Sequence, residues 1–412
     1  MKQYDTYKDS GVQWLGEIPG HWGCVFINRL FNIKAGGDVK PELYADKKDE
    51  NHPFPVYTNT KSADDVYAYT SLATCPSNSI TVTGRGEVGH AIFRETPYDA
   101  IVRLLSLTPK SNIICKFYAY FIDTVIPFSS DSAAIGQLSA VQIKQKHVTL
   151  PPLSEQRSIV SFLDAKCGKI DEWVNKKQKE VEHLQELKQR VIADAVTRGL
   201  NPHVKMKATN IPWLKEIPEH WERTTLRKFL RLFSEKNHGD KQLLSVTREQ
   251  GVIVRDIASK EENHNFIPDD LSGYKYVQIG DFVINKMKSW QGSYGVSDYE
   301  GIVSPAYYTC KLEGIDRTFF SLAIRSKIYV SFFGRYSKGI RVGQWDLSPF
   351  ALTSIPFAVP PLSEQKQIVS YLDAKCSKID KLIANITKEI DRIKEYKQRL
   401  ISDVVTGQIK VC

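Results

Sequence analysis

The sequence predicts an α+β protein in which two strand-rich domains are separated by two long antiparallel coiled-coil helices. Three observations predict this: an internal duplication, a long proline-free amphipathic segment in each copy, and a strand-rich middle in each half. The halves would be related by a pseudo-two-fold axis. A chain of 412 residues is also too long for one compact core.

The duplication is clearest where each half reads P-P-L-S-E-Q. Over Pro151–Thr197, 27 of 47 positions are identical to those of Pro360–Thr406. Upstream, "WLGEIPGHW" at Trp14–Trp22 returns as "WLKEIPEHW" at Trp213–Trp221. Each half therefore has the same order: a lead-in motif, a variable middle, P-P-L-S-E-Q, and a long charged segment.

The charged segments predict helices of about 45 residues, each about 65 Å long. Gly199 and Gly407 stand where a helix stop is expected. The apolar stripes are narrow and flanked by Lys and Glu, which is typical of a coiled-coil seam. They comprise Leu163, Cys167, Ile170, Val174, Val181, Leu184, Val191 and Ala195, and then Leu372, Cys376, Ile379, Ile383, Ile386, Ile390, Ile393, Leu400 and Val404. We expect the two helices to pair, the alternative being that each packs only on its own domain.

The middles are rich in β-branched and aromatic residues, with Gly, Asn and Ser at the breaks, and this predicts twisted sheets. A short helix is expected near Cys115–Thr124 and another near Thr318–Tyr329. The predicted boundaries are 1–150 for the first strand-rich domain, 151–200 for the first long helix, 201–359 for the second domain and 360–412 for the second helix.

The composition narrows the class of protein. Lys plus Arg number 56 against 47 Asp plus Glu, a net charge of +9 that is consistent with a polyanionic partner. No apolar run approaches a membrane span and the start lacks a signal-peptide pattern, so we expect a cytoplasmic protein. The seven cysteines are scattered without a C-x-x-C pair, and neither a disulfide framework nor a metal site is expected.

A glycine pattern at Gly84, Gly86 and Gly89 spells the G-x-G-x-x-G of a dinucleotide-binding turn. Shifted by 206 residues, the last two glycines return as Gly292 and Gly295, but the first falls on Trp290. The residues that follow predict a strand instead of a helix. The pattern therefore favours a tight β-hairpin turn over a cofactor cradle.

This order of motifs resembles the specificity subunit of type I restriction-modification enzymes. The resemblance is carried by the two P-P-L-S-E-Q helices, the two lead-in motifs, "LLSVTREQGVI" at Leu243–Ile253 and the segment Gly280–Tyr308. It implies that each middle is a target recognition domain that reads one half of a bipartite sequence in double-stranded DNA. It also implies that the helices set the spacing between half-sites and dock two methyltransferase subunits, which motor-nuclease subunits then join. The chain itself would be non-catalytic and carry no cofactor.

Candidate DNA contacts are polar, cationic and aromatic residues in predicted turns, because sequence reading needs donors and acceptors at base edges and cations at phosphates. In the first domain they are Tyr57, Asn59, Thr60, Lys61, Thr83 and Arg85. In the second they are Arg248, Lys286, Lys288, Trp290, Gln291, Ser293, Tyr294, Arg335, Ser337, Lys338 and Arg341. Each of them could instead be a solvated loop residue, and Trp290 a core anchor. Lys and Glu on the long helices are expected to form a solvated face or a docking surface.

Two other functions remain open from the residues alone. One is a coiled-coil adaptor that joins proteins without reading DNA. The other is a nucleotide- or S-adenosylmethionine-binding enzyme, from the glycine pattern and from "NHPFPVY" at Asn51–Tyr57, where His52 breaks an amino-methyltransferase motif.

Overall fold

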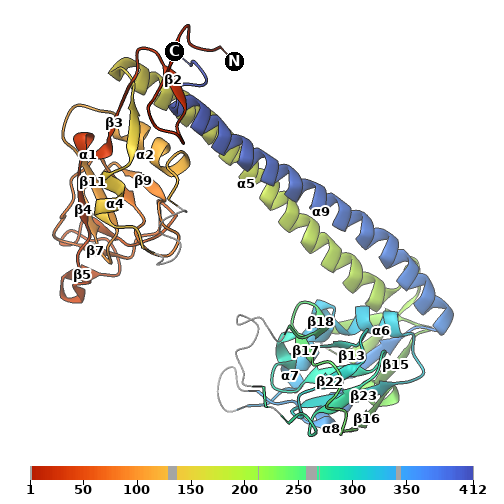
Figure 1. Cartoon of the computed structure of the whole chain (residues 1–412). Coiled ribbons are helices and arrows are strands. Elements are labelled where there is room, and N and C mark those ends of the chain that lie inside the picture. Colours follow the sequence, from red (N-terminus) through yellow and green to blue (C-terminus); the bar gives the residue numbers. More distant parts are fainter. Residues whose placement is uncertain are drawn as a thin grey trace. The chain divides into compact units, whose positions relative to one another are not determined.

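The computed structural model describes residues 2–128, 137–211, 213–256, 267–268, 270–339 and 345–411. The chain forms two compact units: unit 1 is Met1–Gln178 with Thr387–Cys412, and unit 2 is Lys179–Ile386. The two long helices, α5 (Leu153–Arg198) and α9 (Leu362–Val405), are each divided between the units. Each unit therefore combines one strand-rich domain with a stretch of both helices (Figure 1).

Both units are built on the same four-stranded antiparallel sheet. Its order is β4-β11-β8-β9 in unit 1 and β16-β23-β20-β21 in unit 2. The strands are β4 (Phe31–Ala35), β8 (Ser79–Val82), β9 (Ala91–Arg94), β11 (Leu105–Pro109), β16 (Leu230–Phe233), β20 (Phe282–Asn285), β21 (Tyr294–Val296) and β23 (Tyr307–Leu312). The internal repeat is therefore visible in the sheet topology, although the sequences of the two middles have little in common.

Smaller paired strands also correspond between the units. The lead-in motifs form hairpins β1 (Tyr7–Asp9) with β2 (Glu17–Pro19), and β13 (Met206–Ile211) with β14 (Leu214–Pro218). The strand before each long helix pairs with the one that follows the lead-in: β12 (His147–Leu150) with β3 (Gly23–Phe26), and β24 (Pro356–Val359) with β15 (Glu222–Thr225). These pairings join the start of each domain to its end.

The units differ in what is added to the shared sheet. Unit 1 has a second sheet, β10-β6-β7-β5, in which β10 (Asp99–Ala100) runs parallel to β6 (Phe54–Tyr57). Unit 2 has two separate pairs, β17 with β18 and β19 with β22. The remaining bounds are β5 (Tyr44–Ala45), β7 (Ala68–Thr70), β17 (Leu244–Thr247), β18 (Gly251–Val254), β19 (Lys275–Val277), β22 (Gly301–Val303), α1 (Ile27–Leu30), η1 (Pro41–Leu43), α4 (Ala140–Lys144), η2 (Leu226–Lys228), η3 (Ser289–Gln291) and α8 (Pro349–Ser354).

The short helices were predicted with unequal success. Helix α2 (Cys115–Thr124) occupies the predicted range and packs on β8 and β9. The single helix expected over Thr318–Tyr329 is instead two helices, α6 (Arg317–Ile324) and α7 (Lys327–Tyr336). The break falls at Arg325 and Ser326, and Ser326 adopts an extended backbone as the N-cap residue of α7.

The long helices pair antiparallel within each unit, as the apolar stripes predict. Every residue of the two predicted stripes is buried or half-buried. In unit 1 the Lys397 ammonium lies 2.6 Å from the Asp171 carboxylate, and in unit 2 Lys188 lies 2.7 Å from Asp380. Gly199 and Gly407 end the helices with positive φ angles of 74° and 80°. No helix in the described ranges has both the length and the apolarity that a membrane span requires.

The two repeated motifs of each half, the lead-in motif and P-P-L-S-E-Q, contact one another. In unit 1 the Glu155 carboxylate accepts hydrogen bonds from Trp22 Nε1 at 3.0 Å and Tyr4 Oη at 2.9 Å, and lies 2.6 Å from His21 Nε2. These partners lower the pKa of Glu155 although burial acts in the opposite direction. In unit 2 the Glu364 carboxylate accepts from Trp221 Nε1 at 3.1 Å and lies 2.7 Å from His220 Nε2. The lead-in H-W and the glutamate of P-P-L-S-E-Q thus recur together because they form one contact.

The glutamine of P-P-L-S-E-Q fixes the short helix of its domain. Gln156 Oε1 accepts from the backbone N–H of Ile114, the N-cap residue of α2, at 3.0 Å. Gln365 Oε1 accepts from the backbone N–H of Asp316, the N-cap residue of α6, at 2.8 Å. Both glutamines are 1% exposed, so these bonds lie inside the cores. The first turn of each long helix is thereby oriented against its own strand-rich domain.

Candidate nucleic-acid interface

The glycine-rich stretch of unit 1 is the turn of a β-hairpin. Strands β8 and β9 pair antiparallel on either side of it, and Gly86 and Gly89 have φ angles of 68° and 92°. A strand follows the turn, so it lacks the helix N-terminus that holds a pyrophosphate in a dinucleotide cradle. In unit 2, Gly292 likewise has a φ of 94°, whereas Gly295 lies within β21. There an added Cβ would stand 3.1 Å from the Cα of Gly251 in the neighbouring hairpin.

One amide side chain holds this turn against its neighbours. Asn59 Oδ1 accepts from the backbone N–H groups of Gly84 at 2.7 Å and Arg85 at 3.2 Å. Its Nδ2 donates to the carbonyl oxygen of Val102 at 2.7 Å. The oxygen and the nitrogen of the Asn59 side chain are therefore both bonded to backbone groups, and in this structure the side chain positions three loops.

Hydrogen bonds inside the turn also stabilise it. Thr83 Oγ1 donates to the carbonyl oxygen of Glu87 at 2.6 Å and accepts from the backbone N–H of His90 at 2.9 Å. The Lys61 ammonium forms an ion pair with the Glu87 carboxylate. These bonds bring the predicted turn 57–61 and the predicted turn 83–85 together into one loop cluster.

His90 links the same two loops by a contact that depends on its charge. Nδ1 lies 2.5 Å from the Asp123 carboxylate and Nε2 lies 2.9 Å from the carbonyl oxygen of Lys61, so both ring nitrogens face acceptors. Only the imidazolium form donates from both. The hydrogen bond with Asp123 raises the pKa of His90 above its usual 6.5 and outweighs the effect of burial.

This contact predicts a pH-dependent stability. Because the folded-state pKa is raised, the stabilisation is complete below the unfolded value of 6.5 and is lost as pH rises through the folded-state pKa. We expect the denaturation midpoint of unit 1 to fall as pH rises from 6.5 through the raised pKa of His90, and His90→Gln to remove that part of the pH dependence. Denaturation between pH 5.5 and pH 9 measures it. An identical pH profile in the variant would contradict the assignment.

The predicted DNA-contact residues of unit 1 differ in how exposed they are to solvent. Lys61 and Arg85 are exposed and Thr60 is half-buried, so all three are accessible to a ligand. Tyr57 and Thr83 are only 8% and 2% exposed, which corrects their prediction as direct contacts. The Tyr57 ring is covered by the Arg94 guanidinium at 3.5 Å, and Thr83 is consumed within the turn. Both support the loops instead of presenting a surface.

In unit 2 a partly buried arginine plays the part that Asn59 plays in unit 1. The Arg325 guanidinium donates to the carbonyl oxygens of Tyr294 at 2.6 Å, Glu249 at 2.6 Å and Arg248 at 3.1 Å. It thereby ties the β17–β18 turn, which exposes Arg248, to strand β21. Burial lowers the pKa of Arg325, but the guanidinium stays charged at neutral pH.

A second group of predicted residues in unit 2 gathers around η3. Lys286 Nζ lies 3.6 Å from the Asp346 carboxylate, and Lys338 and Asp346 exchange two backbone hydrogen bonds. Lys288 and Lys338 are exposed, while Lys286 and Gln291 are half-buried. The ring of Trp290 lies 5.0 Å from that of Trp345. The buried Nε1 of Trp290 has no acceptor in the described part of the chain.

Several predicted contacts of unit 2 are not available at the surface. Tyr294 is 0% exposed, with its ring stacked on Phe333 at 4.0 Å and its hydroxyl donating to Ile324, so it is a core residue. Ser293 and Ser337 are 3% and 9% exposed and are likewise corrected. Arg335 is exposed, but its guanidinium covers the ring of Trp213 in the lead-in hairpin at 4.1 Å. Arg341 lies outside the described residues.

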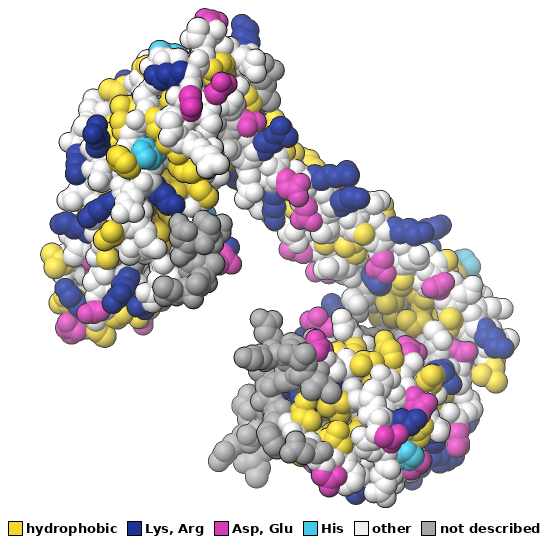
Figure 2. Space-filling model, viewed as in Figure 1, with side chains coloured by type: hydrophobic (Ala, Val, Ile, Leu, Met, Phe, Trp, Pro, Cys, Tyr) yellow, Lys and Arg dark blue, Asp and Glu magenta, His cyan; other side chains and the backbone are white. Residues whose placement is uncertain are grey.

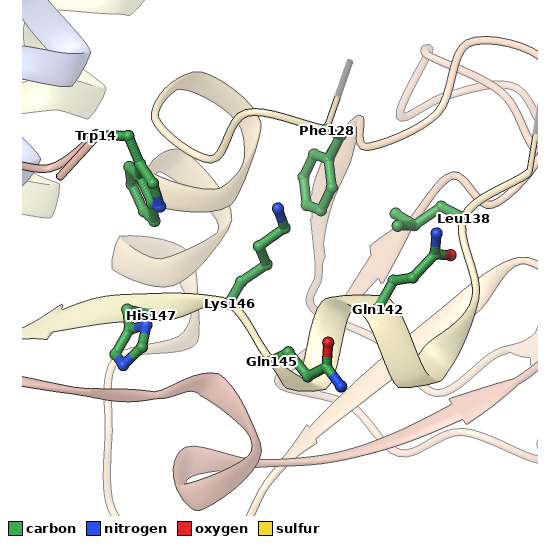
Figure 3. A pocket seen from close by; sticks show the side chains of 7 residues that line it. All are labelled: Trp14, Phe128, Leu138, Gln142, Gln145, Lys146 and His147. Carbon is green, nitrogen blue, oxygen red and sulfur yellow. The ribbon is translucent and has the colours of Figure 1, made fainter. Parts of the chain in front are cut away.

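Pockets in unit 1 have volumes of about 220, 350 and 360 Å³, so two of them reach the lower end of the range typical of small-molecule sites. The one of about 220 Å³ is lined by Trp14, Phe128, Leu138, Gln142, Gln145, Lys146 and His147. The Lys146 side chain rises between Trp14 and Phe128 (Figure 3). Small-molecule sites commonly enclose about 300–1,000 Å³. Over the described residues, no group of three or more His, Cys, Asp or Glu side chains could hold a metal ion.

Sequence reasoning missed three residues of these loop clusters. His90 and Arg325 follow no motif, and their partners are distant in sequence. Arg103 is exposed beside Gly84, and it is preceded by Val102; both have left-handed backbones, with φ angles of 60° and 53°. Only Gly86 and Gly89 gave a local signal, since they marked the tight turn.

Residues 19–183 match the family model described as "Type I restriction modification DNA specificity domain". A putative type I specificity subunit of Mycoplasma pneumoniae, S.MpnORF89P, is 29% identical over 132 residues, or 32% of this chain and 39% of the relative. A second from that organism, S.MpnORF507P, is 30% identical over 33% of this chain and 39% of its own. The chain thus matches about two fifths of the length of these curated relatives.

Other similarities extend over nearly the whole chain. The type I restriction enzyme MjaVIII specificity subunit of Methanocaldococcus jannaschii is 24% identical over 96% of this chain and 94% of the relative. A solved chain described under "complex assembly and conformational transition of the type I R-M system" covers 95% of this chain and 99% of its own, with a TM-score of 0.64 at 12% identity, which shows a shared fold. Through its duplicated frame and its matched specificity domain, the chain is similar over nearly its whole length to type I restriction-modification specificity subunits.

Proposed function

We propose that the chain is the DNA sequence-recognition subunit of a type I restriction-modification complex, with each unit reading one half of a bipartite target. The observation that carries this is a shared sheet order that bears different loops in the two units. A common frame keeps two domains in equivalent roles, whereas different loops offer different donors to different bases. In each unit a polar side chain, Asn59 or Arg325, pins the loops by their backbones.

The long helices would set the spacing between half-sites and dock two methyltransferase subunits, through which motor-nuclease subunits join. Lys, Arg, Asp and Glu side chains are interspersed along them (Figure 2). Such a face suits either solvent or a charged partner surface. The chain would be non-catalytic and act in the cytoplasm, while the partner methylates adenine from S-adenosylmethionine. The rival enzyme function is not favoured, because the glycine stretch is a hairpin turn.

Binding to a pool of randomised duplexes tests this proposal. The full chain would be purified together with the methyltransferase subunit of the same system, and the bound DNA would be footprinted and sequenced. We expect two protected, sequence-specific blocks separated by a spacer without base preference, and tighter binding than by the chain alone. Equal binding of all duplexes by the assembled complex would contradict the proposal.

Single substitutions distinguish a DNA reader from an adaptor. We expect Arg85→Ala to weaken binding by about 1–3 kcal/mol and relax base preference in one half-site only. Lys288→Ala, in the other unit, should weaken binding and reduce its salt dependence by about one counterion. Lys205→Ala is a matched control, because this exposed lysine pairs with Glu219 in the lead-in hairpin. An adaptor would assemble normally with all three variants and show no change in DNA binding.

A further inference from the structure

The turn between β10 and β11 in unit 1 has an unusual backbone. Val102 and Arg103 are consecutive non-glycine residues in the left-handed region, with φ angles of 53° and 60°. This region is costly for any residue with a Cβ, and most of all for a β-branched one. Glycine would remove the cost at either position. Such strain clusters at functional sites, where the surrounding structure holds it in place.

Buried neighbours fix this turn on both sides. Ile101 and Leu104 are each 1% exposed, while Val102 is half-buried and Arg103 exposed. The backbone N–H of Val102 donates to the carbonyl oxygen of Gly37 at 2.8 Å, and that of Leu104 donates to Ile101 at 3.1 Å. The strained pair is therefore lifted to the surface between two anchored core residues.

The turn lies directly against the loop that carries Arg85. Asn59 binds both: its Nδ2 donates to the carbonyl oxygen of Val102, and its Oδ1 accepts from Gly84 and Arg85. The backbones are so close that a Cβ added to Gly84 would lie 2.7 Å from the carbonyl oxygen of Arg103. Glycine at position 84 is thus required by this approach. Within the described ranges, neither Arg85 nor Arg103 has a side-chain hydrogen bond or ion pair.

We propose that Ile101–Leu104 is a second reading loop, and that Arg103 determines sequence specificity in the same half-site as Arg85. This rests on the proposed DNA-reading function and adds a residue that the turn motifs do not reveal. A guanidinium is a rigid fork that matches the O6 and N7 acceptors of guanine. Two arginines on adjoining, backbone-pinned turns would present two such forks in a fixed relation, as reading of neighbouring base pairs requires.

The test compares three variants of the full chain, each assembled with the methyltransferase subunit. Arg103→Gly removes the side chain and also relieves the left-handed backbone, so it should fold at least as well as the original. Arg103→Lys keeps the charge but loses the fork. Arg29→Ala is the matched control, because Arg29 is an exposed arginine of the same unit that lies away from the proposed reading loop. It stands on α1, before β4, whereas Gly36, just after β4, donates its backbone N–H to the carbonyl oxygen of Leu104 in that loop.

The readout is the base preference of binding and methylation on duplexes randomised in both half-sites. We expect Arg103→Gly and Arg103→Lys to relax discrimination at one or two positions of one half-site by about tenfold or more, with the other half-site unchanged. Arg29→Ala should leave both unchanged. Unaltered base preference in Arg103→Gly, or a uniform loss of affinity that lysine restores, would overturn the inference. If the unsubstituted complex itself showed no base preference, that result would instead contradict the proposed function.

Discussion

Replacing Trp22 or Trp221 by alanine is expected to destabilise its own unit by about 3–5 kcal/mol, the range typical of a large aromatic deleted from a core. Trp22 is 0% and Trp221 is 1% exposed. Each substitution leaves a cavity and also removes the indole donor from a partly buried carboxylate, Glu155 or Glu364. Hydrogen exchange under native conditions would assign each loss to its unit, because amides of the affected unit should exchange faster.

The lead-in motif supplies a control for this experiment. Trp14 is the first residue and Trp22 the last residue of the first copy of the lead-in motif, but Trp14 is 37% exposed. Trp14→Ala should therefore cost less than about 1 kcal/mol. If Trp14→Ala destabilised unit 1 as much as Trp22→Ala, the contact between the two repeated motifs would not be what stabilises the domain.

If unit 2 reads one half-site as proposed, replacing Arg325 by leucine is expected to impair reading of that half-site as severely as the loss of a contact residue. The guanidinium is the donor for three carbonyl oxygens that belong to two separate segments. Charge-assisted hydrogen bonds contribute about 1.5–3 kcal/mol each, so the β17–β18 turn should detach from β21. Base preference in that half-site should fall at least tenfold, with the other half-site unaffected.

Arg325→Lys separates charge from geometry in this position. Lysine keeps the charge but, as a single ammonium on a flexible stem, cannot span the same three carbonyls in a planar fork. We expect only partial recovery, measured by methylation of duplexes that carry changes in one half-site at a time. Full activity of Arg325→Leu on all of them would show that Arg325 does not position the turn.

The frame could be predicted from the sequence because its signals are local and repeated. The 3.6-residue periodicity from Leu163 onward, and the glycines at 199 and 407, determine long helices whatever surrounds them. The same holds for α2, whose range was predicted without error. The break between α6 and α7 was missed because apolar residues continue through it, although Ser326 is a residue type favoured at an N-cap.

The site could be predicted only in part, because loop side chains do not alternate inward and outward as those of a strand do. Lys61 and Arg85 were correctly placed on exposed turns. Tyr294 is buried against a distant residue, Phe333, and Thr83 is buried because its hydroxyl accepts from the backbone of His90 across the turn. Arg103 could not be found, since "DAIVRL" reads as one continuous strand. Its left-handed turn is imposed by Gly37 and Asn59, which contact it only in the folded chain.

The division of both long helices between the units has a consequence for synthesis of the chain on the ribosome. Unit 2 is one continuous stretch and has all its residues once Ile386 has been made. Unit 1 lacks Leu400, Ile401, Val404 and Val405, which belong to its core, until the last residues are added. At about 5–20 residues per second, its first 178 residues wait roughly 10–40 seconds for their closing segment. The half that is translated first is therefore the half that finishes folding last, and its apolar surface is the one that needs protection from aggregation in the meantime.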